Sequence, residues 1–220
     1  LSFAIARYNT DGSLDNSFDA DGILITAIGA SSSANSVALQ TDGRIIVAGS
    51  SITGNLATFA MSRYNIDGAP DINFNNNGVL TTVIGSSSAG NSVAIQTDGK
   101  ILLAGFSTMG TGFAMSRYNT NGTLDNGFDG DGILTMDFGY SLENGNGLAI
   151  QADGKIVVAG VSYTSPQPNY NYGAESFFAI ARYNRDGNLD SSFDEDGKLI
   201  SPARATYDAD GVNAVTIQDD

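Results

Sequence analysis

One motif recurs four times in this 220-residue chain and constrains the fold more than any other feature. The copies read RYNTDGSLDNSFDADGIL (Arg7 to Leu24), RYNIDGAPDINFNNNGVL (Arg63 to Leu80), RYNTNGTLDNGFDGDGIL (Arg117 to Leu134) and RYNRDGNLDSSFDEDGKL (Arg182 to Leu199). The first arginines of successive copies are 56, 54 and 65 residues apart. A period of this size predicts one structural unit repeated along the chain.

A second motif alternates with the first. It reads VALQTDGRIIVAG (Val37 to Gly49), VAIQTDGKILLAG (Val93 to Gly105) and LAIQADGKIVVAG (Leu148 to Gly160), and a fourth copy begins as VTIQDD (Val215 to Asp220). An Asp-Gly pair between two apolar runs is a strong signal for a β-hairpin, because the turn needs positive φ angles. The second motif therefore predicts a hairpin in each unit.

Each unit divides into four predicted strands, which in the first complete copy are residues 36–40, 44–49, 59–64 and 78–85. No segment shows the 3.6-residue periodicity of an amphipathic helix. In the segment KIVVAG, Ile156 and Val158 point to one face of the strand and Val157 and Ala159 to the other, so both faces are apolar. A sheet with one face in water would alternate apolar and polar residues. The units are thus expected to be covered on both sides.

Four-stranded units that repeat about every 55 residues and bury both faces predict an all-β fold, a β-propeller or propeller arc of antiparallel blades. We expect a single repeat domain over 1–220, with three complete blades from about 34 to 199 and partial blades at both ends. A β-sandwich is the alternative, although it does not explain so regular a repeat. The unpaired strands at both ends favour a segment of a longer protein over a closed four-bladed ring.

The two alternating motifs resemble those of the delta-sixty repeat family, and the resemblance extends over essentially the whole chain. It implies a β-propeller fold in a bacterial protein that is secreted or attached to the cell surface, and it implies no activity. One departure is the Asp or Asn at positions 19, 75, 129 and 194, where glycine is expected to be commoner in the family.

The composition narrows the classes of function. The net charge is −14, and the chain lacks the clustered Lys and Arg that bind nucleic acid. It contains no cysteine and no histidine, the commonest residues in transition-metal sites and nucleophilic catalysis. No apolar run reaches the length of a membrane span. We expect an extracellular or cell-surface protein.

The constant arginine of the first motif predicts a structural ion pair. This arginine shares a strand face with apolar residues, and a buried guanidinium requires a carboxylate partner. We expect a clasp within each blade, with Phe18 and its equivalents plugging the loop. The predicted pairs are Arg7–Asp15, Arg63–Asp71, Arg117–Asp125 and Arg182–Asp190.

Acidic residues near the end of the motif raise the hypothesis of calcium binding. Alternating carboxylates followed by glycine can surround a hard cation with oxygen atoms. The candidate ligands are Asp19, Asp21, Asp129, Asp131, Asp194 and Asp196. The second copy is neutral at Asn75 and Asn77, which favours a polar turn that needs no metal. No other cofactor is expected.

The insertion in the last unit, roughly 163 to 176, carries Tyr163, Tyr170 and Tyr172 beside two prolines. Such an aromatic loop is typical of contacts with sugars or proteins. Three hypotheses follow: a non-catalytic propeller module for adhesion, assembly or protein interaction; a carbohydrate-binding propeller that uses this loop; and a calcium-dependent hydrolase. The expected partners are a protein or glycan at the cell surface, or further blades of the same longer chain.

Overall fold

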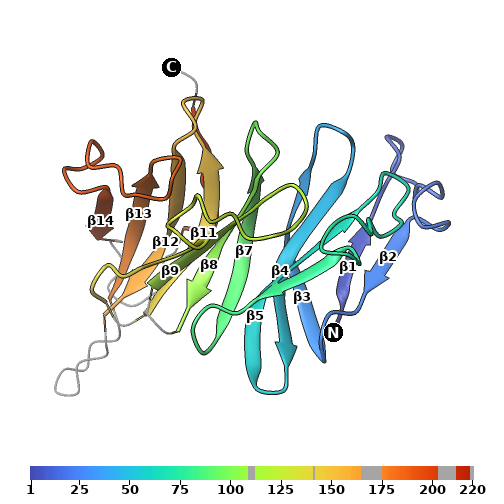
Figure 1. Ribbon diagram of the computed structural model, residues 1–220, viewed down its shortest axis with the longest axis horizontal. Coiled ribbons are helices and arrows are strands. Elements are labelled where there is room, and N and C mark those ends of the chain that lie inside the picture. The colour runs from blue at the N-terminus through green and yellow to red at the C-terminus, as the bar shows by residue number, and fades with distance from the viewer. Residues whose placement is uncertain (109–111, 141, 165–174, 203–211, 219–220) are drawn as a thin grey trace.

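The computed structural model describes residues 1–108, 112–140, 142–164, 175–202 and 212–218. It shows an all-β protein in which antiparallel sheets follow one another in sequence order from the N-terminal to the C-terminal side (Figure 1). Within the described residues no helix is long or apolar enough to cross a membrane.

The first sheet has two strands, β1 (Phe3–Ala6) and β2 (Ile23–Thr26). Three four-stranded sheets follow, each with its strands in sequence order. They comprise β3 (Ser31–Leu39), β4 (Ile45–Thr53), β5 (Leu56–Tyr64) and β6 (Val79–Thr82); β7 (Ser88–Ile95), β8 (Ile101–Ser107), β9 (Gly112–Tyr118) and β10 (Ile133–Met136); and β11 (Leu142–Ile150), β12 (Ile156–Tyr163), β13 (Ser176–Tyr183) and β14 (Lys198–Pro202).

The Asp-Gly pairs form the turns between the first two strands of each four-stranded sheet. The Asp42 carboxylate accepts a 3.0 Å hydrogen bond from the backbone N–H of Arg44, and Gly43 has a φ of +84°. Equivalent turns contain Asp98 and Asp153. The strands that they join are longer than predicted: β3 begins at Ser31 rather than at 36, because its polar first half pairs with the second half of β4.

The first strand of each four-stranded sheet has a break in its pairing register, and the residue at the break is an asparagine. These residues are Asn35, Asn91 and Asn146. A bulge turns a side chain out of the regular ladder, and here Asn35 Nδ2 donates 2.8 Å to the carbonyl oxygen of Gly90 in the next sheet. Asn91 bonds Gly145 in the same way. The first strands of neighbouring sheets, β3, β7 and β11, are therefore joined to one another by these asparagine side chains.

The hydrophobic core consists of three layers, each between two successive sheets. The first layer packs Phe3 and Leu24 of the first sheet, with Phe18 of the loop between its strands, against Val47 and Tyr64 of the second sheet. The other two layers lie on either side of the β7–β10 sheet. Both faces of the two central strands of a sheet are buried, as the continuous apolar runs predicted.

The described part of the C-terminal segment, residues 212–218, lies beside β11. Asn146 Nδ2 donates 2.8 Å to the carbonyl oxygen of Val212, which repeats the asparagine contact between the other first strands. No regular strand is assigned to these described residues. The segment that the sequence predicted to be a first strand thus lies alongside β11.

Candidate functional site

The structure brings each constant arginine to the aspartate eight residues later. Nε of the arginine and Oδ2 of the aspartate are 2.8 Å apart in Arg7–Asp15 and Arg63–Asp71 and 2.6 Å apart in Arg117–Asp125 and Arg182–Asp190. The backbone supports the pair, since Asp15 N–H donates to the Arg7 carbonyl and the other copies repeat this bond. The strand and the following loop thus position the two charged groups together.

Each arginine also covers the phenylalanine of its own loop. The guanidinium carbon of Arg63 lies 4.6 Å from the centre of the Phe74 ring, and the other copies differ by at most a few tenths of an ångström. The same arginine donates through Nη1 to a carbonyl oxygen of the next repeat: Arg7 to Ile66, Arg63 to Thr120 and Arg117 to Arg185. The arginine therefore connects two repeats as well as closing one.

The loops make a second connection between repeats. Asp19 N–H donates 2.8 Å to the Asp67 carbonyl, and Asn75 and Asp129 repeat this bond. Position 19 and its equivalents have φ angles between +47° and +49°, a region in which Asp and Asn are tolerated better than most residues after glycine. This backbone geometry accounts for the Asp or Asn that replaces the expected glycine.

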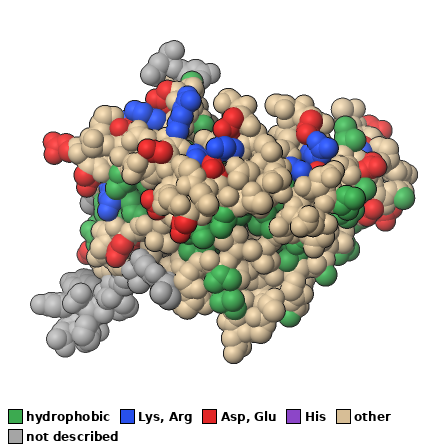
Figure 2. Space-filling view, in the orientation of Figure 1, with side chains coloured by type: hydrophobic (Ala, Val, Ile, Leu, Met, Phe, Trp, Pro, Cys, Tyr) green, Lys and Arg blue, Asp and Glu red, His purple; other side chains and the backbone are tan. Residues whose placement is uncertain are grey.

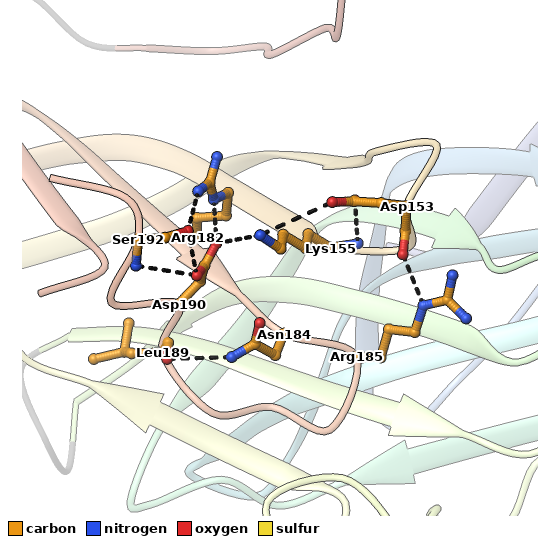
Figure 3. Close-up of polar contacts among 8 residues, drawn as sticks. All are labelled: Asp153, Lys155, Arg182, Asn184, Arg185, Leu189, Asp190 and Ser192. Carbon is orange, nitrogen blue, oxygen red and sulfur yellow. Dashed lines mark hydrogen bonds and ion pairs between the residues drawn. The ribbon is translucent and has the colours of Figure 1, made fainter. Parts of the chain in front are cut away.

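Three of the four aspartates interact with a second cation, which comes from the Asp-Gly hairpin of the same sheet. Asp71 Oδ2 lies 3.0 Å from Arg44 Nε, and Lys100 and Lys155 reach Asp125 and Asp190 at 2.9 Å. Figure 3 shows Lys155 and Arg182 converging on Asp190, with Ser192 donating to its other oxygen. Charged side chains collect along this edge of the molecule, the upper edge in Figure 2.

The electrostatic surroundings keep these aspartates ionised. Burial by itself raises the pKa of Asp71, but the Asn73 backbone N–H and the charges of Arg63 and Arg44 lower it below the ordinary value. For Asp190, the hydrogen bonds from Lys155 and Ser192 are the largest causes of a lowered pKa. These aspartates are therefore ionised carboxylates over the ordinary working pH range.

The second acid of each proposed calcium pair caps a turn. Asp21 Oδ1 accepts a 2.9 Å bond from Ile23 N–H, and Asp131 and Asp196 do the same at 2.8 Å. Asn77 fills this role in the neutral copy at 3.0 Å. Among the described residues no group of three or more acidic side chains is arranged around a common point. Calcium binding by the six aspartates stays a prediction.

Two similar cavities lie between successive Asp-Gly hairpins. The one between the first two four-stranded sheets has a volume of about 550 Å³, and the next about 530 Å³. Gln96 lines both cavities. The side-chain oxygens of Gln40, Gln96 and Gln151 are buried and have no hydrogen-bond partner among the described residues. The cavities are thus lined by recurring glutamines beside basic side chains, a combination suited to a polar ligand with hydroxyl groups.

Glu143 is a buried acid that has no equivalent in the other sheets. It lies opposite Ser162 on β12, where the two preceding sheets have Ser32 and Ser88. Burial raises its pKa to about 7, although backbone N–H groups of Phe138 and Tyr140 donate to the carboxylate and oppose that shift. The Glu143 carboxyl group therefore organises the connection that leads into β11.

Sequence reasoning missed Glu143 and the recurring glutamines. The glutamines had a signal, because the second motif keeps this residue in every copy. No sequence pattern marks Glu143, because its equivalence to Ser32 and Ser88 follows only from the register of the strands. Of the predicted aromatic loop, Tyr163 ends β12 and is half-buried, whereas Tyr170 and Tyr172 lie outside the described residues.

Comparisons with known proteins identify a family. A solved structure of a protein of unknown function from Bacteroides caccae aligns over 91% of this chain and 80% of its own, at 12% identity and a TM-score of 0.36. No curated protein matches the chain significantly. The model of a β-propeller family, described as a domain of unknown function (DUF5122), matches residues 1–18, 40–74, 96–128 and 151–193, which together are more than half of the chain. The chain therefore belongs to this DUF5122 β-propeller family.

Proposed function

We propose that this chain is a non-catalytic β-propeller module of a secreted or cell-surface bacterial protein, acting in adhesion, assembly or protein interaction. Its sheets represent three complete blades and parts of further blades, in the arrangement that the two motifs predict. Membership in a β-propeller family supports this architecture, and the low content of Lys and Arg together with the net charge of −14 supports the extracellular location.

The observation that carries the proposal is the use of the loop carboxylates. Asp15, Asp71, Asp125 and Asp190 each accept bonds from an arginine and from a backbone N–H two residues later. Asp21, Asp131 and Asp196 cap turns. General acid–base or nucleophilic work requires a carboxylate that can change its protonation or attack a substrate, whereas these are held by structural donors in every repeat.

A binding experiment on cells tests this role. The fluorescently labelled chain is added to intact cells of the source bacterium, and bound label is measured before and after treatment of the cells with protease or with periodate, which oxidises glycans. Saturable binding that protease removes supports a protein partner. Calcium-dependent hydrolysis of chromogenic lactones, esters or glycosides by the purified chain would contradict the non-catalytic role.

The two hairpin cavities favour carbohydrate binding as a second candidate function. Glutamine and basic side chains line both cavities and can form hydrogen bonds with sugar hydroxyls. Tyr163 lies at the base of the aromatic insertion proposed to stack on sugars. A glycan array tests this candidate. Gln96→Ala changes both cavities and should abolish retention, whereas Val83→Ser, at an exposed position outside the cavity lining around Gln96, serves as the matched control.

A further inference from the structure

The two hairpin cavities differ in the basic residues that line them. The first cavity, between the first two four-stranded sheets, has two such residues, and the second cavity, between the next two sheets, has three. These residues are Arg44 and Arg63 in the first cavity and Lys100, Arg117 and Arg185 in the second. Arg185 is the additional cation, because Thr120 has the same position in the motif and lines the first cavity.

In the first and last copies of the motif, a serine hydroxyl completes the hydrogen bonding of the constant arginine. Arg7 Nη2 donates 2.9 Å to Ser17 Oγ, and Arg182 Nη2 donates 3.0 Å to Ser192 Oγ. The third copy has Gly127 at this position and therefore has no hydroxyl to offer.

Arg117, the arginine of the third copy, consequently has a free donor at the second cavity. Its Nε binds Asp125 and its Nη1 binds the carbonyl oxygen of Arg185, whereas Nη2 has no hydrogen-bond partner within the part of the chain that the structure describes. Gly127 lines the cavity, and a Cβ added there would lie 3.8 Å from Nη2. Two bonds thus hold the guanidinium in place, and the glycine leaves space beside its third nitrogen.

Arg185 brings a second guanidinium to the same cavity. Its Nε donates 2.8 Å to the carbonyl oxygen of Asp153 (Figure 3). Its side chain packs on Gly154, where an added Cβ would lie 2.1 Å from Nε. None of the ion pairs among the described residues includes Arg185. Its two Nη atoms are therefore available to a ligand.

The charges around the second cavity favour a ligand with a single negative group. Lys100 and Arg117 share one oxygen of Asp125, at 2.9 and 2.6 Å. Asp98 and Asp186 line the cavity and accept bonds from backbone N–H groups of their own turns. These three acids balance the three basic residues, so a phosphate dianion meets no excess of positive charge. A carboxylate can instead be held by direct hydrogen bonds from guanidinium groups.

We propose that the second cavity binds an acidic sugar. Arg117 Nη2 and the Arg185 guanidinium hold the carboxylate, and the side chains of Gln96 and Gln151, which line the same cavity, bind sugar hydroxyls. The volume of about 530 Å³ lies within the range of roughly 300–1,000 Å³ that is typical of small-ligand sites. This site rests on the carbohydrate-binding function proposed above as the second candidate and names the class of sugar.

Calorimetry with the full chain and three defined ligands tests the proposal. Digalacturonate carries carboxylates and hydroxyl groups, its methyl ester keeps the hydroxyl groups without the charge, and glutarate carries carboxylates without hydroxyl groups. We expect saturable binding of digalacturonate. The methyl ester and glutarate should each bind about tenfold more weakly or worse, because each lacks one of the two kinds of contact.

Substitutions that copy one repeat into another locate the site. Gly127→Ser supplies the hydroxyl that Ser17 and Ser192 provide elsewhere and should weaken digalacturonate binding about tenfold, because it occupies Arg117 Nη2. Arg185→Thr introduces the residue of the first cavity and should have a similar effect. Asn73→Ser makes the matching change in the second copy of the motif, beside the first cavity, and should leave the affinity unchanged. Thermal unfolding verifies that each variant folds.

Four outcomes would overturn the proposal, and they separate it from carbohydrate binding in general. Equal affinity for digalacturonate and its methyl ester would leave a sugar site that does not recognise the carboxylate. Equal affinity for glutarate would leave a carboxylate site that does not recognise sugar. Unchanged affinity in both Gly127→Ser and Arg185→Thr would place the sugar elsewhere on the chain. If neither sugar binds and a glycan array is also blank, the carbohydrate-binding function fails as well.

Discussion

The first repeat and the later repeats contain the same motif in different surroundings. Tyr8 is 62% exposed, whereas the equivalent Tyr64 and Tyr118 are each 1% exposed. The Tyr64 and Tyr118 hydroxyls donate to Thr26 and Thr82 of the preceding sheet. The local sequence is the same, and the difference arises from the neighbouring sheet that packs against the later copies.

One repeat therefore forms its own ion pair, but the next sheet is needed to bury it. A repeat protein gains stability from its units and from the interfaces between them. Substitutions at equivalent positions should therefore have unequal effects, large where two sheets enclose the residue and small where one sheet contacts it.

Substitution of the loop phenylalanine should change the free energy of unfolding most, and the loss should depend on whether a following repeat covers the ring. Phe128 is fully buried, and its ring packs beneath Gly187 of the next repeat, where an added Cβ would lie 3.1 Å from the ring. Phe128→Ala should lower the free energy of unfolding by about 4 kcal/mol, because a cavity remains. Phe193→Ala, at a half-buried position, should cost about 2 kcal/mol. Urea denaturation measures both, and equal losses would contradict the role of the following repeat.

The ion pairs should differ in the same direction. Asp125→Ala removes the partner of Arg117 and Lys100 at a nearly buried position and should cost about 3 kcal/mol. Asp15→Ala, at a partly exposed pair, should shift the urea midpoint much less. If Asp125→Ala unfolds at the same urea concentration as the parent, the arginine–aspartate clasp does not stabilise the repeat.

Glu143 distinguishes the third four-stranded sheet from the other two. Its pKa in the folded chain is about 7, above the ordinary 4.5, so between these pH values the folded chain binds more protons than the unfolded chain. Stability should then fall by about 3 kcal/mol as the pH rises from 4.5 to above 7.

The Glu143→Gln variant should lack this part of the pH dependence, and Ser88→Ala, at the equivalent position of the preceding sheet, should retain it. Urea denaturation at several pH values measures the effect. The aspartates with lowered pKa, Asp71 and Asp125, act in another window: their contribution is complete above about pH 4 and is lost as the pH falls further. An unchanged pH profile in Glu143→Gln would rule out this titration.

Removal of a tyrosine hydroxyl should have the smallest effect on stability, and only at the buried copies of the motif. Tyr118→Phe removes the 2.7 Å bond to Thr82 in a buried setting and should cost about 1 kcal/mol. Tyr8→Phe, at an exposed position, should leave the thermal unfolding midpoint unchanged. A similar loss in both variants would mean that the preceding sheet contributes nothing to the later tyrosines.

Much of the fold follows from sequence patterns. The Asp-Gly pairs predicted the hairpins, and the apolar runs predicted strands buried on both faces, because turn conformation and strand facing depend on near neighbours. The strand ends were less accurate: the polar residues Ser31 to Ser33 carry no apolar signal, yet they pair with β4. The bulge at Asn35 is equally a product of packing, since its amide bonds a carbonyl 55 residues away.

The amino-acid sequence is enough to define the repeat, its turns and which arginine and aspartate belong together, because the two residues are only eight positions apart. The contact of Arg63 with the Thr120 carbonyl of the next repeat depends instead on how the sheets pack. The same holds for the burial of Glu143 at the position that Ser32 and Ser88 occupy in the other sheets. Periodicity is a local property of a chain, whereas burial and the pKa of a buried acid depend on which sheet packs against it.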